Sequence, residues 1–221
     1  MKKITKYIPT IILTLLCSCS DYLDIVPDNV TTLDIVFNNR NTAERYLANC
    51  YHFVPDHGSV KRIPGMGAGH ECWFYTTNDS HFDNEVSFYI ARGLQNIDAP
   101  YANYWDGEGG SNLPMFRAIR ECNIFLDYVR DQHKVNDLTD SERKRWIAEV
   151  NVLKAYYHFF LFEHYGPIPI VDKALPVSTD PEGVKVTRMP VDQIVDYMVK
   201  LIDDSYTVSY THLRAHETGR N

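Results

Sequence analysis

Residues 148–169 read AEVNVLKAYYHFFLFEHYGPIP, and this stretch decides the fold class. Apolar side chains recur every three or four positions through it and just upstream of it, which is the spacing of one helical face. This face comprises Trp146, Val150, Leu153, Tyr157 and Phe160. Five Tyr and Phe side chains between residues 156 and 162 cover most of the circumference, which is typical of a buried helix.

Both ends of this helix carry recognisable signals. Thr139-x-x-Glu142 is a capping box, in which each residue satisfies an unpaired backbone N–H near the helix start. At the other end, Gly166 can adopt a positive φ and Pro167 cannot continue the helix. The sequence therefore predicts one long helix that begins after Thr139 and ends near Tyr165.

Three more amphipathic segments surround it. An apolar face over residues 47–54 follows a capping signal at Asn41-x-x-Glu44. A second face, after Pro114, comprises Met115, Ile119, Cys122, Leu126 and Val129. A third helix opens at Pro190, with an inward face of Val191, Ile194, Met198 and Leu201. Four such helices predict a mostly α fold.

Two long segments lack helical periodicity. Residues 55–110 are rich in Gly, Tyr, Asn and Asp, and residues 171–188 contain two prolines. Alternating Val86, Phe88 and Ile90 predict one strand over residues 81–90. Ordered loops of this length usually carry function, so a loop-rich face is the expected place for a ligand.

Composition excludes several classes of protein. The chain has 221 residues, 44% apolar and 13% aromatic, which suffices for a core and excludes a disordered or small disulfide-rich chain. Its net charge of −7 disfavours nucleic acid as a partner, because phosphate affinity comes mainly from Lys and Arg. Cys50, Cys72 and Cys122 are interpreted as small core residues, among which at most one bridge can form.

The N-terminus has the pattern of an export signal. Three lysines precede an apolar run of about ten residues, too short to span a bilayer. Leu16-Cys17-Ser18-Cys19 follows and is similar to a bacterial lipobox. Residues 1–18 are thus predicted to be a lipoprotein signal peptide, with acylation of Cys19 anchoring the protein to a membrane.

The last residues differ from the rest of the chain. Residues 207–221 show little periodicity, and we expect a non-native tail there. The acidic pair Asp203 and Asp204 opposes the helix dipole near the predicted helix end, which favours a native helix that runs further. Residues 19–206 are then the native mature region.

Four segments in order point to one family. They are DYLDIVP at 21–27, FRAIRECNIFL at 116–126, the stretch 148–169, and RMPVDQIV at 188–195. Together behind a lipobox they resemble the N-terminal half of the SusD/RagB outer-membrane nutrient-binding lipoproteins of Bacteroidetes. One departure is Lys154, where the family usually has Arg. Family members continue well beyond this length, so a C-terminal truncation is expected.

The resemblance implies both a fold and a role. The fold would be mostly α, with tetratricopeptide-like helix pairs supporting a loop-rich ligand face. Such proteins are surface-exposed lipoproteins of the outer membrane that capture oligosaccharides, or in some cases peptides. They pass the ligand to a SusC-like TonB-dependent transporter and are not enzymes. No cofactor is expected.

Aromatic rings with nearby carboxamides and carboxylates suit a sugar, which presents flat C–H faces and many hydroxyls. Residues 71–79, ECWFYTTND, offer this combination, since Trp73 and Tyr75 would share one face of an extended chain. A second cluster spans residues 101–107, where Trp105 is expected in the core. The predicted glycan-binding residues are Trp73, Tyr75, Asn78, Asp79, Tyr101 and Asn103. Trp73 has an alternative role as the buried anchor of its loop.

Catalytic and metal sites find little support. His70-Glu71 is not followed by the second histidine of a zinc motif, and His52, His57, His70 and His81 are interpreted as surface residues. Acidic residues in an acidic loop do not by themselves indicate a glycosidase. We therefore expect a glycan-binding lipoprotein, with a peptide-binding family member and a helical scaffold without a small ligand as the alternatives.

Overall fold

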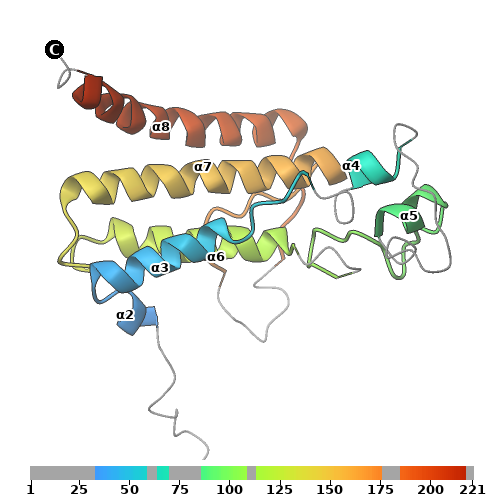
Figure 1. The fold of residues 1–221 in the computed structure, drawn as a ribbon, viewed down its shortest axis with the longest axis horizontal. Helices are drawn as coiled ribbons and strands as arrows, with labels where there is room; N and C mark the ends of the chain where they lie inside the picture. The colour runs from blue at the N-terminus through green and yellow to red at the C-terminus, as the bar shows by residue number, and fades with distance from the viewer. Residues whose placement is uncertain (1–32, 59–63, 70–85, 109–112, 176–184, 218–221) are drawn as a thin grey trace, which may run out of the picture. The chain divides into compact units, whose positions relative to one another are not determined.

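The computed structural model describes residues 33–58, 64–69, 86–108, 113–175 and 185–217, without the side chains of Met66 and of residues 207–217. The chain divides into two units, Met1–Ile35 and Val36–Asn221, and the second contains nearly all of the regular structure. All regular elements in the described residues are helices (Figure 1). They are α2 (Leu33–Val36), α3 (Arg40–Tyr51), α4 (Pro64–Gly67), α5 (Val86–Ala91), α6 (Met115–Arg130), α7 (Asp140–Tyr165) and α8 (Val191–Glu217).

Helix α7 is the centre of the second unit. It packs against α6 on one side and α8 on the other, and α3 contacts both α6 and α7 (Figure 1). The predicted face of α7 is buried, with exposed fractions of 0% for Val150 and Tyr157. The burial does not extend round the whole circumference, because Phe159 is 49% exposed. The mostly α fold and the long central helix are confirmed.

The predicted ends of α7 are present. The Thr139 side chain accepts a hydrogen bond from the Glu142 backbone N–H, and the Glu142 carboxylate accepts one from the Thr139 N–H. Gly166 has φ 68° and donates its N–H to Phe162 O at 2.9 Å. Each signal depends on a few neighbouring residues, so it can be recognised in the sequence without knowledge of the fold.

The cap of α3 lies two residues before the predicted one. The Asn39 side chain, not that of Asn41, accepts the N–H of Thr42 at 3.0 Å. Glu44 instead pairs with Arg40 at 2.9 Å along the helix surface. Asn39 takes the cap because its backbone is extended while the helix has already begun at residue 40.

The predicted strand is wrong over residues 86–90. This part of the chain is α5, in which the consecutive residues Val86, Ser87 and Phe88 are all buried. The helix ends as Arg92 and Gly93 donate to Phe88 O and Ile90 O, each at 2.9 Å, with Gly93 at φ 73°. A short apolar alternation indicates a strand only when a neighbouring strand can pair with it, and the described residues contain none. Residues 81–85 lie outside the described residues.

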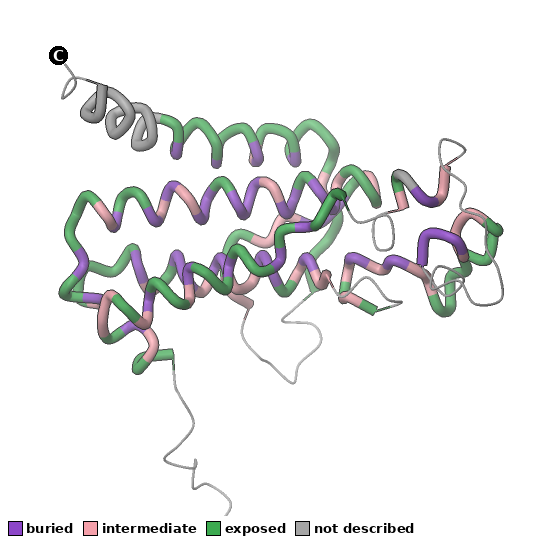
Figure 2. The backbone as a smooth tube through the Cα atoms, viewed as in Figure 1, coloured by how far each residue is buried: buried purple, intermediate pink, exposed green. Residues whose placement is uncertain are grey.

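Helix α8 has two apolar faces. The face toward α7 carries Ile194, Met198, Leu201 and the buried Ser205. Figure 2 shows this inward face buried and the opposite face exposed. The outward residues are Val191, Val195, Val199, Ile202 and Tyr206, with exposed fractions of 39–61%. Val191 was expected on the inward face but belongs to this outward stripe. No described helix has the length and apolar character needed to cross a membrane.

We predict that the outward stripe of α8 makes the isolated chain self-associate, because contiguous exposed apolar surface favours contact with other copies. Replacing Val195 and Val199 with glutamine removes apolar area without changing charge, and this variant should be monomeric. Size-exclusion chromatography with light scattering measures the molar mass of the unsubstituted chain and of this variant. Replacing the exposed neighbours Asp192 and Asp196 with asparagine serves as the matched control and should leave association intact. A monomeric unsubstituted chain at all concentrations would contradict the prediction.

Candidate functional site

The predicted glycan-binding residues fall into two groups in the structure. Four of them lie outside the described residues: Trp73, Tyr75, Asn78 and Asp79. The predicted lipidation residue, Cys19, also lies outside them. Tyr101 and Asn103 are described, and both belong to the segment 86–108 that begins with α5.

Tyr101 forms a stacked aromatic pair with Tyr89 of α5. The ring centroids are 4.7 Å apart and the planes are inclined by 21°. The Gln95 carboxamide fixes the backbone of Tyr101, accepting its N–H at 2.6 Å and donating to its carbonyl at 2.9 Å. Both tyrosines are half-buried. The segment therefore holds partly exposed ring surface in a defined position, as a stacking platform requires.

The Asn103 carboxamide is engaged within its own loop. Its Oδ1 accepts the Trp105 N–H at 3.1 Å, and its Nδ2 donates to Asp106 Oδ1 at 2.6 Å. Asp106 Oδ1 also accepts the Glu108 N–H at 3.1 Å. These bonds form a compact turn of the kind that Asn and Asp favour. In this structure Asn103 therefore shapes the loop that carries Tyr101 and Trp105.

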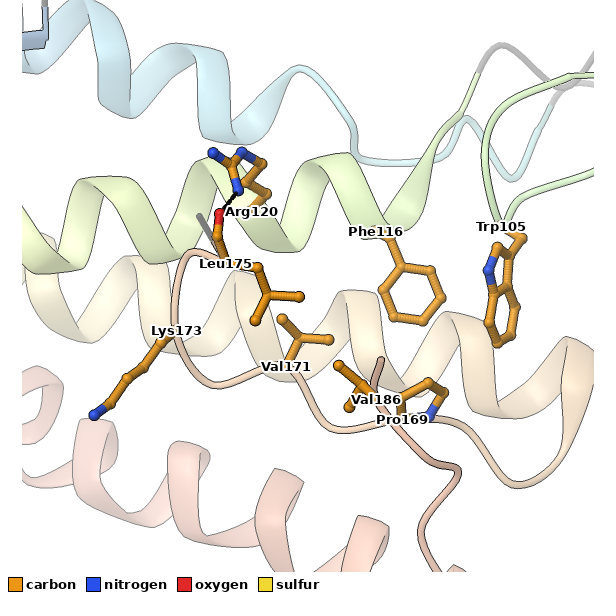
Figure 3. Close-up of a pocket in the computed structure, with 8 residues that line it drawn as sticks. All are labelled: Trp105, Phe116, Arg120, Pro169, Val171, Lys173, Leu175 and Val186. Atoms are coloured by element: carbon orange, nitrogen blue, oxygen red, sulfur yellow. Dashed lines mark hydrogen bonds between the residues drawn. The ribbon is translucent and has the colours of Figure 1, made fainter. Parts of the chain in front are cut away.

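A cavity of about 270 Å³ lies beside this loop. Figure 3 shows the side chains of α6 and of residue 105 pointing toward the segment after α7. The lining residues are Trp105, Phe116, Arg120, Pro169, Val171, Lys173, Leu175 and Val186. Trp105 was predicted in the core, but it is half-buried and forms one wall of this cavity. The sequence did not indicate the cavity, because its walls come from three segments that are distant along the chain.

The indole of Trp105 is held on several sides. Phe116 and Tyr165 approach it edge-on, with ring centroids at 4.6 and 5.5 Å. The Arg188 guanidinium lies over the ring, 5.2 Å from its centroid, and donates to Pro167 O at 2.7 Å. Trp105 is thus a fixed wall rather than a free stacking platform.

The cavity is apolar with cations at its edge. Arg120 donates to the carbonyl of Leu175 (Figure 3), and Lys173 also lines the cavity. Its described lining includes no carboxylate. The arrangement can hold an apolar group.

The segment that lines the cavity is anchored by a buried lysine. Lys154 of α7 is 1% exposed, and its Nζ donates to Asp172 Oδ1 at 2.8 Å and to Asp172 O at 3.0 Å. Tyr197 of α8 donates to the same carboxylate at 2.9 Å. Burial lowers the pKa of Lys154. Burial alone would raise the pKa of Asp172, but the Lys154 hydrogen bond and charge hold it below its usual range.

The described histidines belong to no candidate metal site. In the described ranges no three His, Cys, Asp or Glu side chains group as metal ligands. His57 contacts the Tyr156 hydroxyl instead.

The comparisons with known proteins decide the family. Residues 21–209 match the family model SusD-like_3, which is described as starch-binding associating with outer membrane. The chain belongs to the SusD-like family. The matched residues include the segment 86–108, the residues that line the cavity and all of α3 to α7. A comparison with curated proteins gives no significant match.

Solved structures confirm the SusD-like fold. A "laminarin binding SusD-like protein" aligns with TM-score 0.57 and 16% identity over 78% of this chain and 34% of its own. The protein BT4246 aligns with TM-score 0.57 and 22% identity over 77% of this chain and 26% of its own. A SusD-like protein, BF3747 of Bacteroides fragilis NCTC 9343, aligns with TM-score 0.56 and 16% identity over 84% and 32% of the two chains. This SusD-like chain spans about a third or less of each of them, and the tetratricopeptide-like helix pairs are shared.

Proposed function

We propose that this SusD-like chain captures oligosaccharides at the cell surface and passes them to a SusC-like TonB-dependent transporter. The family description, starch-binding and associating with outer membrane, supports the class of ligand and the location. The observation that carries the proposal is the Tyr89–Tyr101 stack. Gln95 positions the Tyr101 backbone, and the partly exposed rings of the two tyrosines suit the C–H face of a sugar.

In this proposal the protein binds and does not catalyse. Acyl chains on Cys19 hold the chain at the outer membrane, and the loop-rich region of residues 55–110 faces the ligand. Trp73 and Tyr75 extend the aromatic platform, and Asn78 and Asp79 exchange hydrogen bonds with sugar hydroxyls. A ligand held by stacking and exchangeable hydrogen bonds can be released when the protein moves against the transporter.

We expect Tyr101→Ala to weaken glycan binding by about tenfold, since losing one stacked ring removes on the order of 1–1.5 kcal/mol. Native gels cast with soluble polysaccharides measure retention, with laminarin first because one structural relative is named for binding it. Trp73→Ala tests the second predicted ring in the same gels.

Tyr128→Ala is the matched control. The Tyr128 ring stacks on Phe37 with the ring centroids 4.5 Å apart, and both residues lie outside the segment 86–108. The retention of this variant should equal that of the unsubstituted chain, provided that circular dichroism shows both to be folded. Retention that survives Tyr101→Ala would remove Tyr101 from the platform. If no polysaccharide retards the chain, capture of glycans is wrong and peptides become the ligand class to test.

A further inference from the structure

Cys50 of α3 and Cys122 of α6 lie against each other in the core. Both are 0% exposed, and both thiols are free in this structure. The neighbouring contacts fix this register, because Glu121 accepts hydrogen bonds from the Tyr46 hydroxyl and from Asn49 Nδ2. Residues 46 and 49 of α3 therefore meet residue 121 of α6, and the Cys50 thiol lies within hydrogen-bond reach of the Cys122 thiol.

The surroundings keep the reduced pair inert. The hydrogen bond with the Cys122 thiol and burial both raise the pKa of Cys50, so the thiolate that reacts with disulfides is scarce in the folded chain. Tyr157 of α7 closes the site from a third helix by donating its hydroxyl to Cys50 O at 2.6 Å. An oxidant has access to these thiols only before α3, α6 and α7 have packed together.

We infer that Cys50 and Cys122 form a disulfide bond when the chain folds in the presence of a disulfide oxidant, such as oxidised glutathione or a thiol–disulfide oxidoreductase. One thiolate attacks the oxidant's disulfide and expels one of its sulfurs as a thiolate, giving a mixed disulfide. The second cysteine, as its thiolate, then attacks the first and expels the other sulfur. The two cysteines lose two protons and two electrons, and the oxidant becomes two thiols.

The position of this bridge gives it a consequence for the ligand loops. Residues 51–121 lie between the two cysteines, and they include the whole loop-rich region with Trp73, Tyr75 and Tyr101. The bridge would tie together the two helices from which this region departs and returns. A bridge that closes so long a loop restricts the unfolded chain strongly, and about 10 °C of added thermal stability is expected. This inference does not depend on the proposed glycan binding.

The test refolds the full chain from guanidinium at low concentration with reduced and oxidised glutathione, then blocks free thiols with iodoacetamide. Trypsin should release residues 46–61 joined to residues 121–130, two hydrogens lighter than the separate peptides, and reduction should separate them. Cys72→Ser is the matched control and should leave the joined peptides unchanged. Recovery of both peptides in alkylated form, or of either one joined to another cysteine, would overturn the inference.

Thermal unfolding gives a second readout. The bridged chain should melt about 10 °C higher without reductant than with it, whereas Cys50→Ala should melt at the same temperature in both conditions. A bridged chain whose melting does not respond to reductant would overturn the stabilising role.

Discussion

Replacing Arg143 with methionine is expected to lower the free energy of unfolding by about 4 kcal/mol. Arg143 of α7 is 7% exposed, and its guanidinium donates to four backbone carbonyls at the end of α6 and in the following turn. The acceptors are Val129 O at 2.6 Å, Asp131 O at 3.2 Å, Lys134 O at 3.1 Å and Val135 O at 3.0 Å.

The physical reason is that a helix C-terminus leaves carbonyls without partners inside the helix, and here the hydrogen bonds to Val129 O and Val135 O are buried. Methionine has similar length but no donor, so several carbonyls would lose their hydrogen bonds together, and the cation that complements the α6 dipole would disappear. The turn also depends on the Arg143 hydrogen bonds at Val135, because the Val135 backbone has a positive φ of 50° that the surrounding bonds must maintain.

Urea unfolding measures the effect on the background with Val195 and Val199 replaced by glutamine, which we expect to be monomeric. Arg145→Met is the matched control on the same helix, since Arg145 is exposed and makes one surface ion pair with Glu149 at 3.5 Å. That variant should lose about 0.5 kcal/mol or less. A loss below about 1 kcal/mol for Arg143→Met would mean that other donors replace the guanidinium.

Acidification from pH 7.5 to 4.5 is expected to remove about 2.5 kcal/mol of stability through His158 alone. His158 of α7 is 0% exposed, and burial lowers its pKa to about 4. A carbonyl can only accept, so Nδ1 donates to Lys154 O at 2.7 Å, and Nε2 is left to accept the Val171 N–H at 3.5 Å. A second proton would sit on Nε2, against that N–H and close to the Lys154 ammonium.

The sign follows from the direction of the shift. The folded chain binds the proton less readily than the unfolded chain, whose histidine has a pKa near the usual value of about 6.5. The contribution of His158 is therefore complete above about pH 6.5 and is lost as the pH falls toward 4. Val171 lines the cavity beside Trp105, so protonation also disturbs the segment that forms one of its walls.

Urea unfolding at several pH values measures this contribution as the difference between the unsubstituted chain and His158→Gln, which has no titrating ring. Loss of acidic side-chain interactions is common to both chains and cancels. His133→Gln, at an exposed position, is the control and should follow the unsubstituted chain. Parallel pH profiles for His158→Gln and the unsubstituted chain would show that His158 does not carry the effect.

The candidate site was predictable in composition but not in arrangement. The pairing of aromatic residues with carboxamides drew attention to Tyr101. The structure stacks that ring on Tyr89 and bonds the Tyr101 backbone to the Gln95 carboxamide. The Tyr89 contact was not expected, because residues 81–90 were predicted to be a strand, and the Gln95 contact depends on how the loop after α5 folds. Asn103 has the residue type of a ligand contact, yet its amide is used by the local turn. A polar side chain's partners are set by the nearest folded backbone, which the residue type does not specify.

By itself the sequence determined the helices with long periodic faces and local end signals. The capping box of Thr139 and Glu142 and the positive φ of Gly166 depend on a few consecutive residues, so they needed no knowledge of the fold. Only the tertiary structure decided what depends on distant segments meeting. Arg143 has its acceptors across a turn, Cys50 meets Cys122 across two helices, and the cavity beside Trp105 has walls from three segments. Short elements such as α5 belong with these, because their few internal hydrogen bonds leave the choice of conformation to the contacts that bury them.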